Sequence, residues 1–369
     1  MPTEDTAVTS NVRAAIHPVA TRRILRLALG VALSLCCSQI FTWNISFVAP
    51  VLTLVLLATP FPAPSFKQGL GFILALLLPS IASMALIPFL VHARWVGILL
   101  MTLALFYSFY YTARGGKPVL GAFMTIGLTL VVTVGSVNPQ VLVALVEALA
   151  INAVFAIVFV RIAHALLPDL PADPLAVKPS PPPVVKPHLK EARRDAFRAL
   201  LVVLPIALLF LFMSGSTSYT VVMIKVASMG QQASADKSAG MGRSLLESTI
   251  WGGIGALIGW TLLSIWPSLL PYTLLVALAG LLYGRGVFQG PGMHPKFSMW
   301  SYAYLTAIII LAPSLLDSAG SGGSGAAIWS RVWLFIVIAF YGTAAVAVFN
   351  AFWPAKKPGR NRGQSQVPE

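Results

Sequence analysis

Long apolar segments, separated by short polar or basic stretches, follow one another along nearly the whole chain. Each segment is long enough, or nearly long enough, to cross about 30 Å of hydrocarbon as an α-helix. The pattern therefore predicts an all-α, polytopic membrane protein with about twelve transmembrane helices. We expect these helices at residues 24–41, 47–61, 69–91, 95–112, 118–136, 140–165, 198–213, 219–232, 244–265, 268–284, 298–315 and 328–352.

The composition agrees with a lipid environment. Hydrophobic residues make up 57% of the 369 residues and charged residues only 10%, whereas soluble domains carry about 25% charged residues. This composition excludes a soluble enzyme, and we expect no enzymatic activity. The net charge of +14 does not indicate nucleic-acid binding, because the basic residues lie between apolar segments and are not interleaved with aromatic side chains.

The positions of the basic residues predict the orientation of the chain. With the amino terminus in the cytoplasm, all 25 Lys and Arg residues except Arg94, Arg331 and Lys225 fall in inner segments or at inner span ends. Cytoplasmic loops of membrane proteins carry such an excess of Lys and Arg. We therefore expect both termini in the cytoplasm and an even number of spans.

A proline-rich stretch, residues 168–190, separates two sets of apolar segments. Its composition favours an extended spacer over a packed core. The predicted organisation is a first six-helix membrane half (1–167), a Pro-rich cytoplasmic linker (168–190), a second six-helix half (191–353) and a basic cytoplasmic tail (354–369).

The two halves carry similar residues at matching positions, 171 residues apart. Three pairs recur at this offset, all at inner span ends: Arg22–Arg23 with Arg193–Arg194, Gly69 and Gly71 with Gly240 and Gly242, and Arg114–Gly115 with Arg285–Gly286. This match predicts a duplicated unit. Because six spans are an even number, the copies would form parallel repeats.

The second segment of each half is short. Residues 47–61 contain Pro50 and, near their end, Pro60, and residues 219–232 follow Gly215 and contain Gly230. Transporters built from repeats often place their substrate site where corresponding spans are short or interrupted. These two segments are therefore the predicted site.

Lys225 lies within the second of these segments, where the first half has Leu54. A lysine near a helix centre costs about 2.5 to 3.5 kcal/mol on insertion scales, so it usually has a partner or faces water. We interpret Lys225 as an anion-attracting or proton-coupling group. Two alternatives stay open: a structural ion pair, or a lysine that reaches a membrane interface.

Two carboxylates could pair with Lys225. Glu147 lies inside the sixth segment and Glu247 one turn into the ninth. Either could carry a proton, because burial favours the neutral acid and a nearby lysine favours the charged one. Glu247 also has a simpler interpretation, as a solvated helix end beside Arg243. Four further residues are candidate polar lining: Asn152, Asn44, Gln231 and Gln232.

No cofactor or metal site is expected. The five histidines lie on separate segments without a paired spacing. A nucleotide-binding motif is absent from the sequence, so an active transporter of this kind would use the proton gradient.

The residues around the second segments resemble the fusaric-acid-resistance and aromatic-acid-exporter (FUSC-type) superfamily of bacterial inner-membrane proteins. The resemblance rests on short motifs, after an Arg-rich start of the first span: Thr42-Trp43-Asn44, Phe47-Val48-Ala49, Lys67-Gln68 before Gly69 and Gly71, Tyr219-Thr220-Val221-Val222, and Gly240-Met241-Gly242-Arg243.

The resemblance implies export of small, often aromatic, organic acids or drugs across the bacterial inner membrane. It also implies a periplasmic adaptor of the membrane-fusion type, while a homo-oligomer is left open. Many exporters in the superfamily carry a soluble domain after each half, and here only a proline spacer and a short tail follow. Two alternatives stay open: a passive anion channel, and a membrane scaffold or assembly protein that transports nothing.

Overall fold

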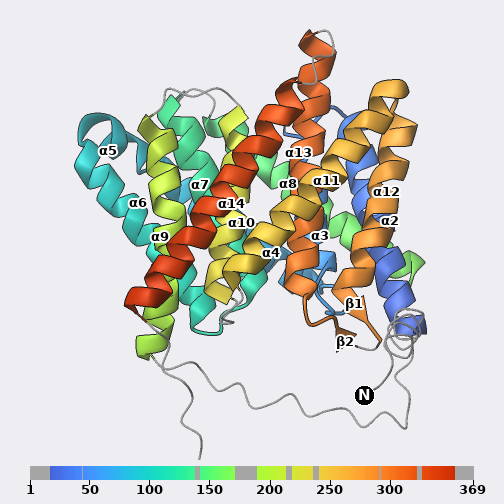
Figure 1. Cartoon of the computed structure of the whole chain (residues 1–369), viewed down its shortest axis with the longest axis horizontal. Helices are drawn as coiled ribbons and strands as arrows, with labels where there is room; N and C mark the ends of the chain where they lie inside the picture. The colour runs from blue at the N-terminus through green and yellow to red at the C-terminus, as the bar shows by residue number, and fades with distance from the viewer. Residues whose placement is uncertain are drawn as a thin grey trace, which may run out of the picture.

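The computed structural model describes residues 17–43, 45–137, 142–170, 189–212, 218–235, 241–290, 292–321 and 326–353. These residues form a bundle of α-helices (Figure 1). The helices are α2 (Pro18–Ile40), α3 (Val48–Leu57), α4 (Phe66–Met84), α5 (Ile87–His92), α6 (Arg94–Ala113), α7 (Pro118–Val137), α8 (Leu142–Leu166), α9 (Leu189–Phe212), α10 (Ser218–Ala235), α11 (Met241–Ile265), α12 (Leu269–Val287), α13 (Phe297–Ser321) and α14 (Ala326–Phe352).

The predicted all-α membrane fold is confirmed. Eight of the described helices are long and apolar enough to cross a membrane, and each of the twelve predicted segments contains a helix. The described residues contain one small sheet, an antiparallel pair of β1 (Phe288–Gln289) and β2 (Gly292–Met293) in which Phe288 faces Met293. Large apolar side chains on α4, α6 and α12 point outward, as a lipid-facing surface requires.

The second segment of the first half is shorter than predicted. Helix α3 has 10 residues, or about 15 Å of helix, and the chain then runs without helix to Ser65. Pro60, Pro62 and Pro64 explain this end, because proline has no N–H for a helical hydrogen bond. Nearly all of α3 is buried within the protein, which is the condition for irregular backbone at membrane depth.

The corresponding segment of the second half is not short. Helix α10 has 18 residues, or about 27 Å, and continues through Gln231 and Gln232, which stand where the first half has Pro60 and Phe61. The prediction that this segment is as short as residues 219–232 is therefore wrong, because the helix runs from Ser218 to Ala235. Glutamine retains the backbone N–H that proline lacks, so the helix continues.

Asn152 of α8 holds the start of α3. Its Oδ1 accepts a hydrogen bond from the backbone N–H of Ala49 (3.0 Å), and its Nδ2 donates to the carbonyl of Ala148 (2.7 Å). The first N–H groups of a helix have no partner within the helix, and the fully buried Asn152 side chain supplies one. The residue predicted as polar lining is thus positioned as a helix cap.

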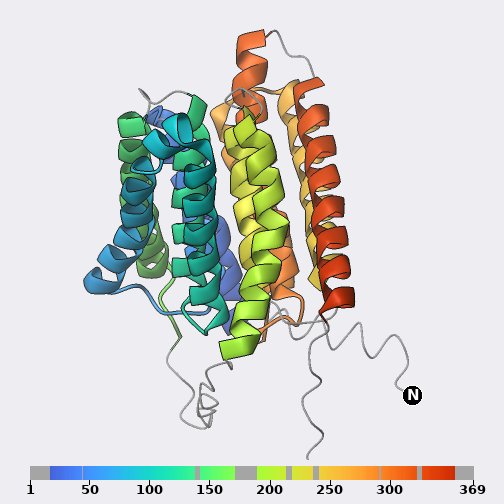
Figure 2. The ribbon, with the colours of Figure 1, turned by 90° about the vertical axis from the view of Figure 1, so that its left-hand side faces the viewer.

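The helices of the two halves pack in corresponding pairs. Helix α2 packs on α12 and α9 packs on α6, so the first helix of each half contacts the fourth helix of the other. Within each half the third helix packs on the fifth, as α4 does on α7 and α11 on α13. Between the halves the second helix of one contacts the fifth of the other, as α3 does with α13 and α10 with α7. Figure 2 shows the first half, blue to green, mainly on the left and the second half, lime to red, on the right. This correspondence supports the predicted repeat.

Arginines close both halves at one end of the bundle, which we call the inner end. Helices α2 and α9 begin there, and α14 ends there (Figure 1). Arg22 and Arg26 donate to the carbonyls of Pro168 (2.8 Å) and Leu167 (2.6 Å), just after α8. Arg194 donates to the carbonyl of Trp353 (2.8 Å), just after α14. Cations at these positions stabilise the negative ends of the helix dipoles.

Replacing Asn152 with alanine should lower the free energy of unfolding by about 1 to 2 kcal/mol, because the N–H of Ala49 loses its buried acceptor. Thermal unfolding of the purified protein in detergent would measure the change. Ser264→Ala is the matched control, since the exposed Ser264 hydroxyl bonds only within its own helix. Equal stability of the two variants would contradict the capping role.

Candidate functional site around helix α10

Helix α10 lies inside the bundle, in contact with α6 and α7 of the first half and with α9, α11, α13 and α14 of the second. It carries an unusual number of polar side chains for such a place. Five of them are at most 5% exposed: Lys225, Ser228, Gln231, Gln232 and Ser234. A polar helix in the interior of a membrane protein marks a functional site or a network that links helices.

Lys225 is buried where α10, α11 and α13 meet. Its side chain is 1% exposed, and its Nζ donates a hydrogen bond to Oγ1 of Thr306 (2.7 Å). The Thr306 hydroxyl in turn donates to the carbonyl of Tyr302 (2.7 Å). On the other side of Thr306, α11 approaches so closely that a Cβ on Gly252 would lie 2.6 Å from the carbonyl oxygen of Ala303. The Lys225 amine is therefore enclosed by the protein.

Neither predicted carboxylate pairs with Lys225. Glu247 lies near the inner end, where its Oε1 accepts from Arg243 Nε (2.5 Å) and its Oε2 is 3.5 Å from Lys296 Nζ. This geometry matches the simpler interpretation of Glu247 as a helix end beside Arg243. Glu147 lies on an exposed face of α8. The structural ion pair considered as an alternative for Lys225 is thus absent from the described residues, and its hydrogen bond goes to a neutral hydroxyl.

Gln231 links the two halves. Its Oε1 accepts from Thr112 of α6 (3.0 Å), and its Nε2 donates to the carbonyl of Gly121 (2.9 Å) and to Oγ1 of Thr125 (2.5 Å) on α7. Ser108 shares a hydrogen bond of 2.7 Å with Thr125. All of these groups are buried. Lipid offers them no hydrogen-bond partner, so they must bond to one another. The sequence did not indicate this network, because serine and threonine are common in membrane helices.

The remaining predicted lining residues are separated from one another. Gln232 donates to Oγ of Ser244 on α11 (3.0 Å), and Asn152 lies on α8 as the cap of α3. Asn44 is outside the described residues. The structure therefore brings together Lys225, Gln231 and Gln232 on one helix and leaves the other candidates elsewhere.

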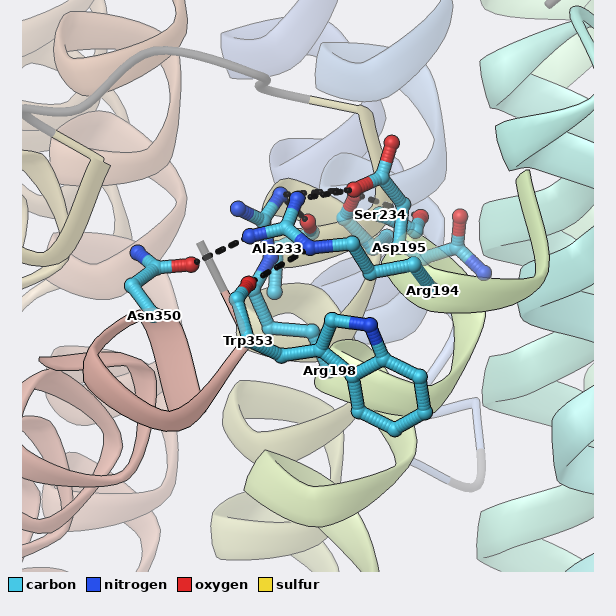
Figure 3. Close-up of polar contacts among 8 residues, drawn as sticks. Arg194, Asp195, Arg198, Ala233, Ser234, Asn350 and Trp353 are labelled. Atoms are coloured by element: carbon cyan, nitrogen blue, oxygen red, sulfur yellow. Dashed lines mark hydrogen bonds and ion pairs between the residues drawn. The ribbon is translucent and has the colours of Figure 1, made fainter. Parts of the chain in front are cut away.

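The inner end of α10 is tied to α9 by a buried charge cluster that the sequence did not reveal (Figure 3). Arg198 donates to the carbonyl of Ala233 (2.7 Å). Asp195 Oδ1 lies 3.4 Å from Arg194 and 3.9 Å from Arg198, and Arg194 also donates to Asn350 of α14 (3.1 Å). The available signal is the spacing of Arg194, Asp195 and Arg198 in the first turns of α9, whereas their charge alone predicts only a basic inner segment.

Metal ligands are not clustered in the part of the chain that the structure describes: no group of three His, Cys, Asp or Glu side chains comes together there. The chemistry that α10 offers is a buried amine, two amides and several hydroxyls, which suit hydrogen bonding and anion binding.

The fold and this buried polar helix define a multi-pass helical membrane protein. A sequence family described as a protein of unknown function (DUF2955) matches residues 23–163, a stretch that runs from α2 into α8. The chain is similar to that family over most of its first half. The comparisons with curated proteins and with solved structures found no match.

A methyl group at Gly121 should break the link between the halves. The added Cβ would meet Oγ1 of Thr112 and would lie 3.0 Å from Oε1 of Gln231. We expect Gly121→Ala to lower the free energy of unfolding by about 1 to 3 kcal/mol through overpacking. Gly71→Ala on α4 is the matched control, because nothing lies within 4 Å of its Cβ position and alanine favours helix. Thermal unfolding measures the change. Equal unfolding temperatures for Gly121→Ala and Gly71→Ala would contradict the tight packing around Gly121.

Proposed function

We propose that this protein is an inner-membrane efflux transporter that exports small organic, and in particular aromatic, acids or amphipathic drugs. The supporting observation is the amine of Lys225, buried within the helical bundle beside a neutral hydroxyl. We propose transport and not an enzymatic reaction, with the proton gradient as the energy source.

The argument for an anionic substrate is electrostatic. A buried charge is strongly destabilising unless it is paired, and Thr306 offers Lys225 an acceptor but no negative charge. A carboxylate that enters the bundle would supply that charge and form a charge-assisted hydrogen bond. Lys225 thus has the character of a substrate contact whose partner arrives from outside the protein.

The placement of α10 supports alternating access between two halves. The helix contacts both halves, and on its inner side Gln231 and Arg198 bind it to α6, α7 and α9. Movement of one half against the other would break the bonds of Gln231 and open a route from the inner end to Lys225. We expect the described conformation to be the one closed on the inner side.

The resemblance to FUSC-type exporters supports the same direction of transport. It favours a bacterial inner-membrane location with both termini in the cytoplasm and a periplasmic adaptor as partner. The short motifs that carry it include Gly242 and Arg243 at the start of α11 and Phe47 to Ala49 at the start of α3.

Replacing Lys225 with alanine should reduce export of an aromatic acid at least tenfold, because the substrate carboxylate loses its cationic partner. The measurement is efflux of radiolabelled benzoate from proteoliposomes, with equal protein incorporation and an unchanged unfolding temperature as the folding check. Lys67→Ala is the matched control, since Lys67 is exposed at the start of α4. Equal flux through wild type and Lys225→Ala would overturn the role of Lys225.

The same vesicles separate the alternatives. Benzoate flux that depends on an imposed pH gradient supports a proton-coupled transporter, and Glu147→Gln tests Glu147 as the proton carrier. Flux that follows the membrane potential without proton movement would identify a passive anion channel. No flux for any member of an organic-acid and drug panel, together with a stable partner complex, would identify a scaffold.

A further inference from the structure

A small pocket opens at the inner end of the first half, away from Lys225. Arg23 and Arg26 of α2 line it together with His164 of α8 and the non-helical segment after α3, which contributes Thr59 and Phe61. Two guanidinium groups and an imidazole thus line the same space. This combination favours an anion.

The imidazole of His164 has one ring nitrogen without a hydrogen-bond partner. The residue is 9% exposed, and its Nδ1 lies 2.8 Å from the carbonyl of Val160. A carbonyl can only accept, so Nδ1 carries the proton and donates. Nε2 is buried and makes no hydrogen bond of normal geometry with the described residues, and the backbone of Phe61 lies close to the ring. In the neutral ring Nε2 can only accept a hydrogen bond. To donate one to an anion, Nε2 must bind a proton.

The surroundings of the pocket are positive. Arg22, Arg23 and Arg26 approach from α2. Among the described residues the nearby negative side chain is Asp169, which pairs with Arg26 (2.8 Å) and is itself about half exposed. Arg26 also caps the end of α8 at Leu167. Within the part of the chain that the structure describes, three guanidinium groups thus outnumber one carboxylate.

Among the described residues, the elements that form this pocket differ between the two halves. Helix α3 ends at Leu57, which leaves room beside α2 and α8. In the second half α10 continues through the corresponding positions. Asn350 lies three residues before the arginine-bound carbonyl of Trp353, as His164 lies three residues before that of Leu167, and Asn350 binds Arg194. The early end of α3 and the histidine thus occur together in the first half.

We infer that this pocket binds a small oxyanion, a carboxylate or a phosphate group, and that one proton binds to His164 together with it. The arginines supply the attraction, and the protonated Nε2–H donates the additional hydrogen bond. The inference does not depend on the transport role of Lys225. Such an anion has two sources, a solute from the cytoplasm or the headgroup of an anionic lipid.

Calorimetric titration of the purified full-length protein in detergent with benzoate and with inorganic phosphate tests the soluble source. Saturable binding is expected for at least one probe, and the affinity should increase as the pH falls from about 8 to about 6, the range where imidazole titrates. Heats measured in buffers of different ionisation enthalpy should show uptake of a proton on binding.

Three variants separate the roles of the side chains. Arg23→Gln should weaken binding at least tenfold, and His164→Gln should retain binding but lose both the pH dependence and the proton uptake. Arg161→Gln is the matched control, because Arg161 is exposed on α8 and does not line the pocket. Unchanged unfolding temperatures show that the variants are folded.

The lipid source is tested in nanodiscs of phosphatidylcholine with or without phosphatidylglycerol. Stabilisation by phosphatidylglycerol that Arg23→Gln abolishes and Arg161→Gln retains would identify a headgroup as the anion. Absence of binding in both experiments, or equal weakening by Arg23→Gln and Arg161→Gln, would overturn the proposal. Neither result would change the benzoate flux expected for the Lys225→Ala variant. The binding proposal and the transport proposal can therefore be refuted independently.

Discussion

The structure depends on one constraint: in hydrocarbon, each backbone or side-chain polar group must find its partner within the protein. Helices satisfy most of the backbone, and the exceptions determine the architecture. Asn152 supplies an acceptor at the start of α3, and Arg26 and Arg194 supply donors beyond the ends of α8 and α14. The same constraint makes Lys225 conspicuous, because its hydroxyl partner accepts a hydrogen bond but supplies no negative charge.

The reciprocal packing of the halves follows from this constraint together with the repeat. Each half places its first helix against the fourth helix of the other, so neither half presents a complete surface by itself. Close contact depends on glycine at such crossings. A Cβ on Gly280 of α12 would lie 2.7 Å from the Cα of Ala28 on α2, a distance that only a residue without a side chain permits.

The sequence predicted the features that one segment determines by itself. Apolar length located the helices, and Pro60 with its neighbours predicted an early end of the second span. Partners could not be predicted, because packing between distant segments selects them. Gln231 and Gln232 suggested lining, yet their side-chain amides bond to helices α6, α7 and α11. Asn152 suggested lining as well, and only the approach of α3 makes it a cap.

The divergence between the two copies indicates where function lies in a duplicated fold. Residues that maintain packing are shared in kind, such as the arginines that cap the last helix of each half. Residues that packing does not require differ: Lys225 replaces Leu54, and Asn350 occupies the helix-end position that His164 has in the first half. A buried leucine would serve stability better than an amine in the same place. The amine of Lys225 in one copy and the imidazole of His164 in the other, at different depths in the bundle, therefore indicate selection for chemistry in addition to stability.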